Sequence, residues 1–359
     1  MLSPNRILVI RLDRLGDVVL STPVLSVLRR HFPHAFIAML VRPPCLDVVD
    51  GHPAVNEVLV YEKEGAHRSL PATVRFARRL RRYAFDAALM LHPSNRSHWI
   101  PWLAGIPVRI GYDRKCGWLL THRRPHRKQA GRRHEALYTL ELLEPFGISD
   151  AEATPHVPVR PAAARQVAAR LEAASIRPEE RLVAVHPSAS CVSKRWMPER
   201  FAQVADRLVT ERGVRICLIA GRGGDAVHAG RVAQAMRQPA LNLAGRLSVR
   251  ELAALLARCR LLISNDSGPV HVAAAVGTPV VDIFGRNQAG LSPARWGPLG
   301  EGHVMLHKEV GCVTCLAHNC DINFLCLTSL TVDDVYQAAV SILERPQKVS
   351  DTFQSGKSV

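Results

Sequence analysis

The stretch Ile263–Gly285, ISNDSGPVHVAAAVGTPVVDIFG, constrains the fold more than any other part of the chain. It continues an apolar strand that begins at Leu261, and then it reads as a turn, a helix and a second strand. Asn265 and Asp266 are short acceptors of the kind favoured at a helix N-cap, and Gly268 allows another group to approach the backbone. Such a helix start presents N–H groups and the positive end of the helix dipole at the ligand-binding edge of a parallel sheet. The turn therefore predicts a phosphate site, with an ordinary capped turn as the alternative.

Apolar strand-like runs alternate with helical segments along the whole chain, which is typical of βαβ units in a parallel sheet. Strands are expected at 6–12, 35–41, 55–61, 85–92 and 108–112, and again at 181–187, 215–221, 240–245, 260–266 and 279–285. Helices are expected at 70–83, 135–147, 199–212, 226–236, 248–259 and after Gly268. The predicted fold class is α/β, with two doubly wound, Rossmann-like domains that face each other across a cleft.

A proline-rich segment near the middle of the chain is the best candidate for a linker. Residues 149–164 contain Pro155, Pro158 and Pro161, which interrupt the alternation of strands and helices. We therefore expect one domain over residues 1–158 and another over residues 159–330. A terminal helix is expected over 331–345, and the polar tail 346–359 is expected to be disordered.

The charge of the chain indicates anionic partners. Lys and Arg number 47 against 31 Asp and Glu, a formal net charge of +16, which suits nucleic acid, a phosphorylated substrate or an acidic membrane face. Two basic runs, Arg75–Tyr83 and Thr121–His134, lie in the first half. The first also fits a solvated helix face, and the second predicts a mobile basic surface loop. Aromatic residues make up only 5% of the chain, which argues against binding of single-stranded nucleic acid.

No apolar run approaches the roughly 20 residues that a membrane span needs, and the first residues lead directly into a strand. We therefore expect a cytoplasmic protein, in which scattered cysteines are reduced. Four of the nine cysteines form a C-x2-C-x4-C-x5-C cluster: Cys312, Cys315, Cys320 and Cys326. These thiols could hold zinc, close a disulfide pair or simply pin a loop.

The chain lacks a complete dinucleotide fingerprint. Gly221, Gly223 and Ala226 match the loose form G-x-G-x-x-A, but the next strand ends in Arg246 where the fingerprint requires an acid. This argues against an oxidoreductase and leaves Asp225 as a candidate acceptor for ribose hydroxyls at the turn itself.

Five motifs together resemble the bacterial ADP-heptose:lipopolysaccharide heptosyltransferases. They are L-G-D after the first strand, R-I-G-Y, H-P-S…K-R-W, the Gly-rich turn with its acid, and D-S-G-P-V-H…G-T-P-V-V…F-G. The resemblance covers about Arg6–Thr328. It implies a GT-B fold, an acceptor-binding N-terminal domain and a nucleotide-sugar-binding C-terminal domain. It also implies inverting transfer of L-glycero-D-manno-heptose from ADP-heptose to the inner core of lipopolysaccharide, with no cofactor and no required metal.

The resemblance also implies roles for individual residues. Asp17 of L-G-D would be the base on the acceptor hydroxyl, with Asp13 as a rival base and a helix N-cap as the alternative role of Asp17. Lys194 of K-R-W would bind the diphosphate and act in catalysis, or else be a surface charge. The remaining nucleotide-sugar-binding residues would be Ser188, Asp225 (ribose), Asp266 (heptose), Ser267 and Gly268 (phosphates), and His271.

Two other functional classes stay open at this point. One is a GT-B enzyme that uses another nucleotide sugar, and the other is a basic nucleic-acid-binding protein, for which no binding module is recognised. With the heptosyltransferase interpretation, the basic loop predicts an anionic lipid acceptor and peripheral association with the inner face of the inner membrane.

Overall fold

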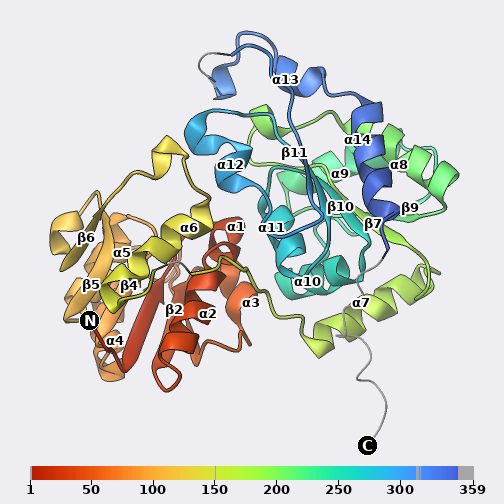
Figure 1. Ribbon diagram of the computed structural model, residues 1–359. Coiled ribbons are helices and arrows are strands. Elements are labelled where there is room, and N and C mark those ends of the chain that lie inside the picture. Colours follow the sequence, from red (N-terminus) through yellow and green to blue (C-terminus); the bar gives the residue numbers. More distant parts are fainter. Residues whose placement is uncertain (1, 150, 313–314, 316, 347–359) are drawn as a thin grey trace, which may run out of the picture.

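Each half of the chain forms a six-stranded parallel sheet with helices on both faces, and the two halves lie side by side (Figure 1). The computed structural model describes residues 2–149, 151–312, 315 and 317–346. This architecture confirms the predicted α/β class with two doubly wound sheets. The terminal tail expected to be disordered lies almost entirely outside the described residues.

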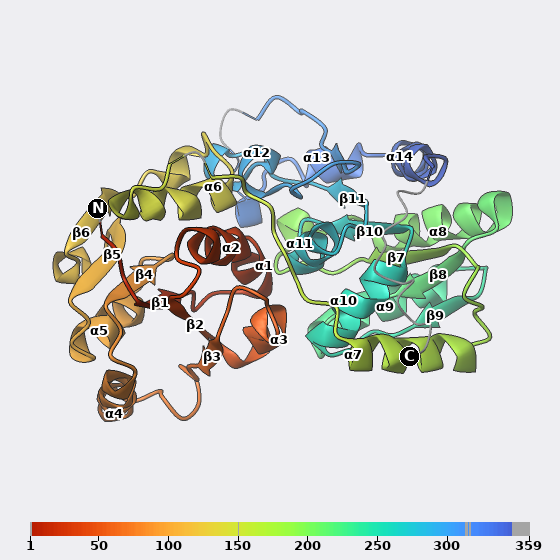
Figure 2. The ribbon, with the colours of Figure 1, turned by 60° about the horizontal axis from the view of Figure 1, so that its bottom comes forward.

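The first sheet has the strand order β3-β2-β1-β4-β5-β6. Its strands are β1 (Arg6–Ile10), β2 (Phe36–Val41), β3 (Glu57–Val60), β4 (Ala87–Met90), β5 (Val108–Asp113) and β6 (His122–Pro125). Its helices are α1 (Leu15–Val19), α2 (Thr22–His31), α3 (Leu46–Val49), α4 (Leu70–Leu80), α5 (Asn95–Leu103) and α6 (Glu135–Leu140). Helices α4 and α5 cover one face, and α1, α2 and α6 lie on the other (Figure 2).

The second sheet repeats the arrangement with the order β12-β11-β10-β7-β8-β9. Its strands are β7 (Leu182–His186), β8 (Arg215–Leu218), β9 (Ala240–Asn242), β10 (Leu261–Asn265), β11 (Val280–Ile283) and β12 (Val304–Leu306). Its helices are α7 (Pro161–Ala173), α8 (Pro198–Arg212), α9 (Gly224–Ala235), α10 (Val249–Arg258), α11 (Gly268–Ala275), α12 (Pro293–Trp296), α13 (Leu325–Thr328) and α14 (Val332–Leu343).

The central strands explain the stability of each half. In β1, β7 and β10 nearly every residue is buried, as expected for strands covered by helices on both faces. One hydrophobic cluster runs from the α1–α2 face of the first sheet to the α7, α10 and α11 face of the second. The two halves therefore share part of their core, with α1 packed against α11 and α3 against α10.

Local sequence signals explain where several helices start. Ser248 Oγ accepts a hydrogen bond from Glu251 N, and the Glu251 carboxylate accepts one from Ser248 N, which forms the predicted capping box of α10. Thr331 and Asp334 form the same box at the start of α14, which packs on the second sheet. Gly147, with φ of 79°, ends the predicted helix 135–147. The second half of that helix, Glu141–Phe146, is a 3-10 turn that contains Pro145.

Three elements differ from the sequence-based expectation. The basic run 121–134 is not simply a loop, because it contains β6 and a 3-10 turn over Lys128–Ala130. The predicted linker ends in a helix, since Pro161 is the first residue of α7. Strand β12 was not predicted at all, because three residues give too short an apolar run to recognise.

Among the described residues, no helix has both the length and the apolar composition that crossing a bilayer would require.

Buried histidines make stability depend on pH. Burial lowers the pKa of His52, His98 and His186 to about 4 and that of His271 to about 3. Between these values and the unfolded pKa of about 6.5, the unfolded chain binds more protons, so stability is lost as pH falls through that window. Each group contributes up to about 1.4 kcal/mol per pH unit.

We therefore expect the thermal midpoint to fall steadily as the pH is lowered from 7 to 4.5. Calorimetry or circular dichroism at several pH values measures this. The variant His98→Gln should show a shallower dependence, and a midpoint that stays constant over this range would contradict the assignment of neutral buried histidines.

Candidate active site

A cavity of about 700 Å³ lies between the two halves, at the carboxyl edges of both sheets. Each sheet contributes the loops at its topological switch point, between β1 and β4 in the first and between β7 and β10 in the second. Ligands of open α/β sheets bind at such points. The structure brings all of the sequence-predicted donor and catalytic residues to this cavity: Asp17, Ser188, Lys194, Asp225, Asp266, Ser267, Gly268 and His271.

On the side of the second sheet, a cation and a carboxylate meet at the start of α11. Lys194 Nζ lies 2.5 Å from Asp266 Oδ2, with the Lys194 and Asp266 side chains 16% and 6% exposed. Ser267 is the N-cap of α11 and Gly268 its first residue. An anion placed here meets an ammonium group and the positive end of a helix dipole, so the arrangement suits a phosphate group.

The predicted capping role of Asn265 and Asp266 is wrong. Ser267 occupies the N-cap position and no side-chain hydrogen bond caps it. Asn265 instead accepts a hydrogen bond from Trp196 N at 3.0 Å and donates to Pro187 O at 2.8 Å. Since these two residues flank Lys194 in the chain, Asn265 holds the K-R-W and H-P-S segments against the start of α11.

A second carboxylate lies at the start of α9. Ser188 Oγ donates a hydrogen bond to Asp225 Oδ1 at 2.5 Å. His186 Nδ1 lies 3.0 Å from Ser267 Oγ and 3.3 Å from Ser264 Oγ. Ser188 therefore positions the Asp225 carboxylate, while the neutral His186 ring links the loops after β7 and β10.

Another carboxyl group lies beneath this region. Asp282 on β11 is fully buried, and burial, together with the nearby Asp266 carboxylate, raises the pKa of Asp282 well above its usual range. Neither of its oxygens has a hydrogen-bond partner among the described residues. Burial therefore disfavours a negative charge on Asp282, while the nearby Lys194 opposes this shift.

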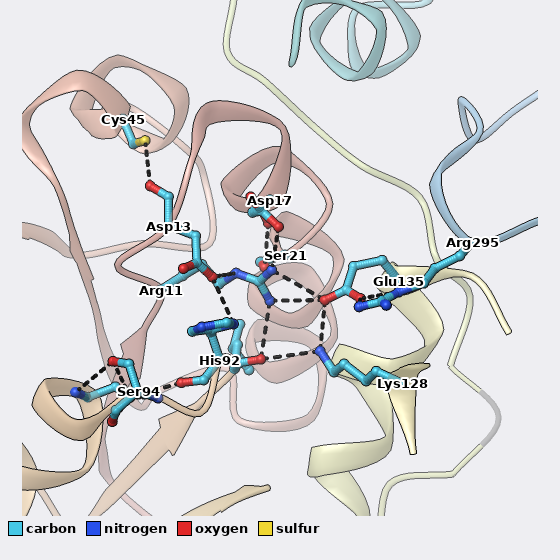
Figure 3. Close-up of polar contacts among 12 residues, drawn as sticks. Arg11, Asp13, Asp17, Ser21, Cys45, His92, Ser94, Lys128, Glu135 and Arg295 are labelled. Carbon is cyan, nitrogen blue, oxygen red and sulfur yellow. Dashed lines mark hydrogen bonds and ion pairs between the residues drawn. The ribbon is translucent and has the colours of Figure 1, made fainter. Parts of the chain in front are cut away.

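On the side of the first sheet, three carboxylates converge on one buried guanidinium (Figure 3). Arg11, at the end of β1, lies with Nε 2.9 Å from Asp13 Oδ2 and with one terminal nitrogen 2.8 Å from Asp17 Oδ1. His92 Nδ1 lies 3.3 Å from the same Asp13 oxygen. Asp13 thus contacts both Arg11 and His92. Among the described residues, the Asp17 side chain has one polar partner, Arg11, which it contacts through Oδ1.

The surroundings of Asp17 favour its action as a base. Its pKa is raised, chiefly by burial and further by Asp13 and Glu135, and the attraction of Arg11 opposes this shift. The positive end of a helix dipole alone would stabilise the charged carboxylate and make it a weaker base. The pKa of Asp17 is raised instead, because the loss of solvation on burial outweighs the effect of the helix dipole.

Glu135 is the centre of a buried charge cluster that joins the two halves (Figure 3). Its Oε1 lies 2.7 Å from Lys128 Nζ and 3.2 Å from Arg11, and its Oε2 lies 2.8 Å from Arg295 of α12. The three neighbouring cations lower the pKa of Glu135 despite its burial. Burial lowers the pKa of Lys128 to about 8. Part of the predicted mobile loop is therefore a buried contact between the halves.

Sequence reasoning missed Glu135, Lys128, Arg295 and the role of Arg11. Two signals were present. Arg11 is a charge that ends an otherwise apolar strand, and Glu135 is the first acid after a long basic run. These signals suggest an ion pair between Arg11 and Glu135, but the pair forms only because segments distant in the sequence pack together.

The two halves also approach each other closely at Gly16. A Cβ built on Gly16 would lie 2.6 Å from His271 Cδ2 and 3.4 Å from Gly268 Cα. Because His271 is buried, its ring has little room to move away. Only glycine at position 16 lets α1 and α11 approach this closely.

We predict that Gly16→Ala lowers kcat/KM for the reaction expected from the sequence, heptose transfer from ADP-heptose, by roughly tenfold to a hundredfold, because it moves the two sides of the cavity apart. Steady-state kinetics measures this, and nucleotide affinity should change little. Gly230→Ala is the matched control, since a Cβ there meets nothing within 4 Å. Unchanged kinetics of Gly16→Ala would contradict the role of this contact.

The four cysteines of the cluster do not line this cavity. Its members are free thiols that line a second cavity of about 460 Å³ near Gly285. Cys326 Sγ donates to Gly285 O at 2.7 Å, and Cys320 Sγ accepts from Phe324 N at 3.2 Å. No group of three or more His, Cys, Asp or Glu side chains in the described part of the chain is arranged to hold a metal ion. Metal binding by Cys312, Cys315, Cys320 and Cys326 stays a prediction.

Comparison with known proteins places the chain among related sequences and folds. The family model described as glycosyltransferase family 9 (heptosyltransferase) matches residues 73–325. Lipopolysaccharide heptosyltransferase 3 of Escherichia coli K12 is 26% identical over 94% of this chain and 97% of that protein. Lipopolysaccharide heptosyltransferase 1 of Pseudomonas aeruginosa is 25% identical over 88% of this chain and 87% of that protein.

Solved structures agree with this placement. A family 9 glycosyltransferase from Veillonella parvula has a TM-score of 0.86 at 27% identity, covering 94% of this chain and 97% of that one. The E. coli ADP-heptose heptosyltransferase II has a TM-score of 0.78 at 23% identity, covering 94% and 98%, and supports the GT-B fold. Because the family model spans more than two thirds of the chain, the chain belongs to glycosyltransferase family 9, the heptosyltransferases.

Proposed function

We propose that this protein transfers L-glycero-D-manno-heptose from ADP-heptose to the inner core of lipopolysaccharide, with inversion at the anomeric carbon. One observation carries the proposal: the Asp17 carboxylate and the Lys194–Asp266 pair line one cavity from opposite halves. The names of the relatives, lipopolysaccharide heptosyltransferases of two organisms, support the choice of heptose and acceptor.

The roles of the residues follow from the chemistry of inversion. Asp17 takes the proton of the acceptor hydroxyl, and the oxygen forms a bond to the anomeric carbon on the face opposite the diphosphate. The bond from that carbon to the diphosphate oxygen breaks, and ADP leaves with the electron pair. Negative charge grows on the departing diphosphate, so Lys194 and the N-terminal backbone of α11 stabilise the transition state more than the ground state.

The remaining residues bind the donor. In this proposal Asp225, positioned by Ser188, accepts hydrogen bonds from the ribose hydroxyls, and Asp266 contacts the heptose. The backbone of Ser267 and Gly268 holds the phosphates, and His271 forms the wall against α1. Residues 1–158 would bind the acceptor and residues 159–330 the donor. No cofactor and no metal enter this scheme.

The same proposal places the protein at the inner face of the inner membrane, where it would act as a peripheral protein on a lipid-borne anionic acceptor. The excess of Lys and Arg over acids supports this, since basic surfaces are attracted to anionic lipid. Nucleic acid is not proposed as a partner.

A nucleotide panel tests the identity of the donor. ADP should raise the thermal midpoint of the protein clearly more than UDP or GDP at the same concentration, because a ligand that binds only the folded state stabilises it. A larger shift with UDP or GDP would indicate a GT-B enzyme with a different donor. Equal small shifts, with a strongly salt-dependent shift on adding DNA or RNA, would instead favour nucleic-acid binding.

We predict that Lys194→Ala weakens ADP binding by about tenfold or more, since a charge-assisted contact to phosphate contributes roughly 1.5–3 kcal/mol. Isothermal titration calorimetry measures the affinity. Lys308→Ala is the matched control, because Lys308 pairs with Asp334 at 3.1 Å on the same half but away from the cavity. An unaltered affinity of Lys194→Ala would show that Lys194 does not bind the diphosphate.

A further inference from the structure

Three tryptophans form an exposed cluster on the first half of the chain. Trp99 and Trp102 lie on α5, and Trp118 lies in the 3-10 turn Gly117–Leu119. Their exposed fractions are 36%, 43% and 61%. The ring centroid of Trp99 lies 5.5 Å from that of Trp102 and 6.4 Å from that of Trp118, both in edge-to-face geometry. Exposed large aromatic side chains gathered in this way mark interaction surfaces on soluble proteins.

Local contacts hold the tryptophan cluster in place. A capping box between Ser94 and Ser97 fixes the start of α5, and Arg123 donates a hydrogen bond to Trp118 O at 3.4 Å. Cys116 Sγ lies 3.8 Å from Asn95 Oδ1, which ties the turn of Trp118 to the first residue of α5. These contacts fix the backbone that carries the three tryptophans, so the fold itself keeps their rings exposed.

Most of the excess positive charge of the chain lies in the segment of sequence that contains this cluster. Residues 65–133 contain sixteen Lys and Arg but only two acids, Asp86 and Asp113, and this excess of fourteen is nearly the whole formal charge of +16. Arg114, Lys115 and Arg123 are exposed beside Trp118 in the chain. Helix α4 packs next to α5 (Figure 2) and adds the exposed Arg75, Arg78 and Arg79.

We propose that the tryptophan cluster and the surrounding Arg and Lys side chains dock the protein on an anionic phospholipid surface. Indole rings favour the boundary between water and lipid, because one end is apolar and the other donates a hydrogen bond. Cations near an anionic leaflet add attraction of about 1 kcal/mol each. Apolar area and positive charge together are what interfacial binding requires.

The position of the cluster relative to the active site fits a lipid-borne acceptor. Helix α5 begins at Asn95, three residues after His92, and His92 lines the cavity. Arg114 also lines the cavity, and Trp118 follows it by four residues. Docking through this surface would place a membrane beside the segments that carry His92 and Arg114 to the cavity. The inference deepens the proposed function and rests on it for the identity of the acceptor, but the docking itself does not depend on the acceptor.

The positive charge near the tryptophans argues against a second copy of this chain as the partner of the cluster. Two copies of this chain that met through the cluster would bring like charges together, which costs several kcal/mol.

Sedimentation with vesicles tests the proposal in the absence of any acceptor or donor. The vesicles are phosphatidylcholine alone, or an equal mixture of phosphatidylcholine and phosphatidylglycerol. We expect the full chain to bind the anionic vesicles and to bind phosphatidylcholine weakly. The triple variant Trp99→Ser, Trp102→Ser, Trp118→Ser should lose roughly tenfold or more in binding, and Lys115→Gln with Arg123→Gln should lose several-fold.

Two control variants on the second half and a fluorescence measurement complete the test of vesicle binding. Val227→Ser and Arg231→Gln change an exposed apolar residue and an exposed cation on the second half, and both should bind vesicles as the unmodified protein does. Quenching of tryptophan fluorescence by bromine-labelled lipids in the unmodified protein should be strong in anionic vesicles, and this holds even if the triple variant fails to fold.

Three outcomes would overturn the proposal: equal vesicle binding by the triple variant, no lipid quenching in the unmodified protein, or a dimer in solution that the triple variant abolishes. Transfer to a soluble, deacylated acceptor separates this inference from the proposed function. The triple variant should keep that activity, and a protein that docks on vesicles yet transfers no heptose would refute the function and leave the docking intact.

Discussion

Replacing Asp17 by asparagine is expected to lower kcat by about 100- to 10,000-fold, the usual contribution of a general base. The side chain keeps its shape but can no longer take a proton. Because the pKa of Asp17 is raised by burial and activity needs its deprotonated form, the acid limb of the unmodified enzyme should lie above the usual range for an aspartate. Single-turnover rates across pH measure the loss of rate in Asp17→Asn and the position of the acid limb in the unmodified enzyme. The affinity of Asp17→Asn for ADP should stay nearly unchanged.

The neighbouring carboxylate provides the control. Asp13→Asn removes the partner of Arg11 Nε and of His92 and should lower the rate much less, since Asp13 Oδ2 already contacts both of these neighbours. If Asp13→Asn loses more activity than Asp17→Asn, Asp13 is the base. Turnover of Asp17→Asn close to that of the unmodified enzyme would remove Asp17 from the mechanism.

Replacing Glu135 by glutamine is expected to cost about 3–5 kcal/mol in the free energy of unfolding, the typical result of removing one partner of a buried ion pair. Glu135 is 1% exposed and contacts Arg11, Lys128 and Arg295. The neutral amide leaves three buried or nearly buried cations without their shared carboxylate. Urea denaturation measures the loss.

A double-mutant cycle separates the loss of the Glu135 ion pairs from a nonspecific destabilisation of the fold. Lys128→Met removes one of the three cations, so Lys128→Met with Glu135→Gln should be less destabilised than the two single changes added together. Glu144→Gln is the surface control, because Glu144 pairs with Arg124 while 67% exposed, and such pairs contribute roughly 0–1 kcal/mol. A cost for Glu135→Gln as small as that of Glu144→Gln would show that the cluster does not hold the halves together.

The sequence predicts the fold well wherever a local signal decides the structure. Apolar runs identify the central strands, such as β1 and β10, and the Ser248–Glu251 capping box marks the start of α10. Elements without such a signal were missed. Strand β6 reads HRRP and has no apolar residue besides proline, so its pairing with β5 depends on the rest of the sheet and not on its own composition.

The candidate site shows the same division. Motifs at strand ends predict residues that the structure brings to one cavity, because the carboxyl ends of parallel strands share one edge of a sheet. The charge cluster of Glu135 was not predictable, since it joins Arg11 to Lys128 and Arg295 across 284 positions of the chain. The side-chain role of Asn265 was misassigned because a capping residue and a residue that pins neighbouring loops have the same sequence signature.

Transfer of heptose from ADP-heptose to a panel of progressively truncated lipopolysaccharide core acceptors tests the central claim most directly. The product is followed by mass and by the configuration of the new linkage. We predict that at least one acceptor gains a single heptose with inverted configuration, and that the Asp17→Asn variant gives none of this product in the same time. No gain in mass on any acceptor, or a product of retained configuration, would contradict the account.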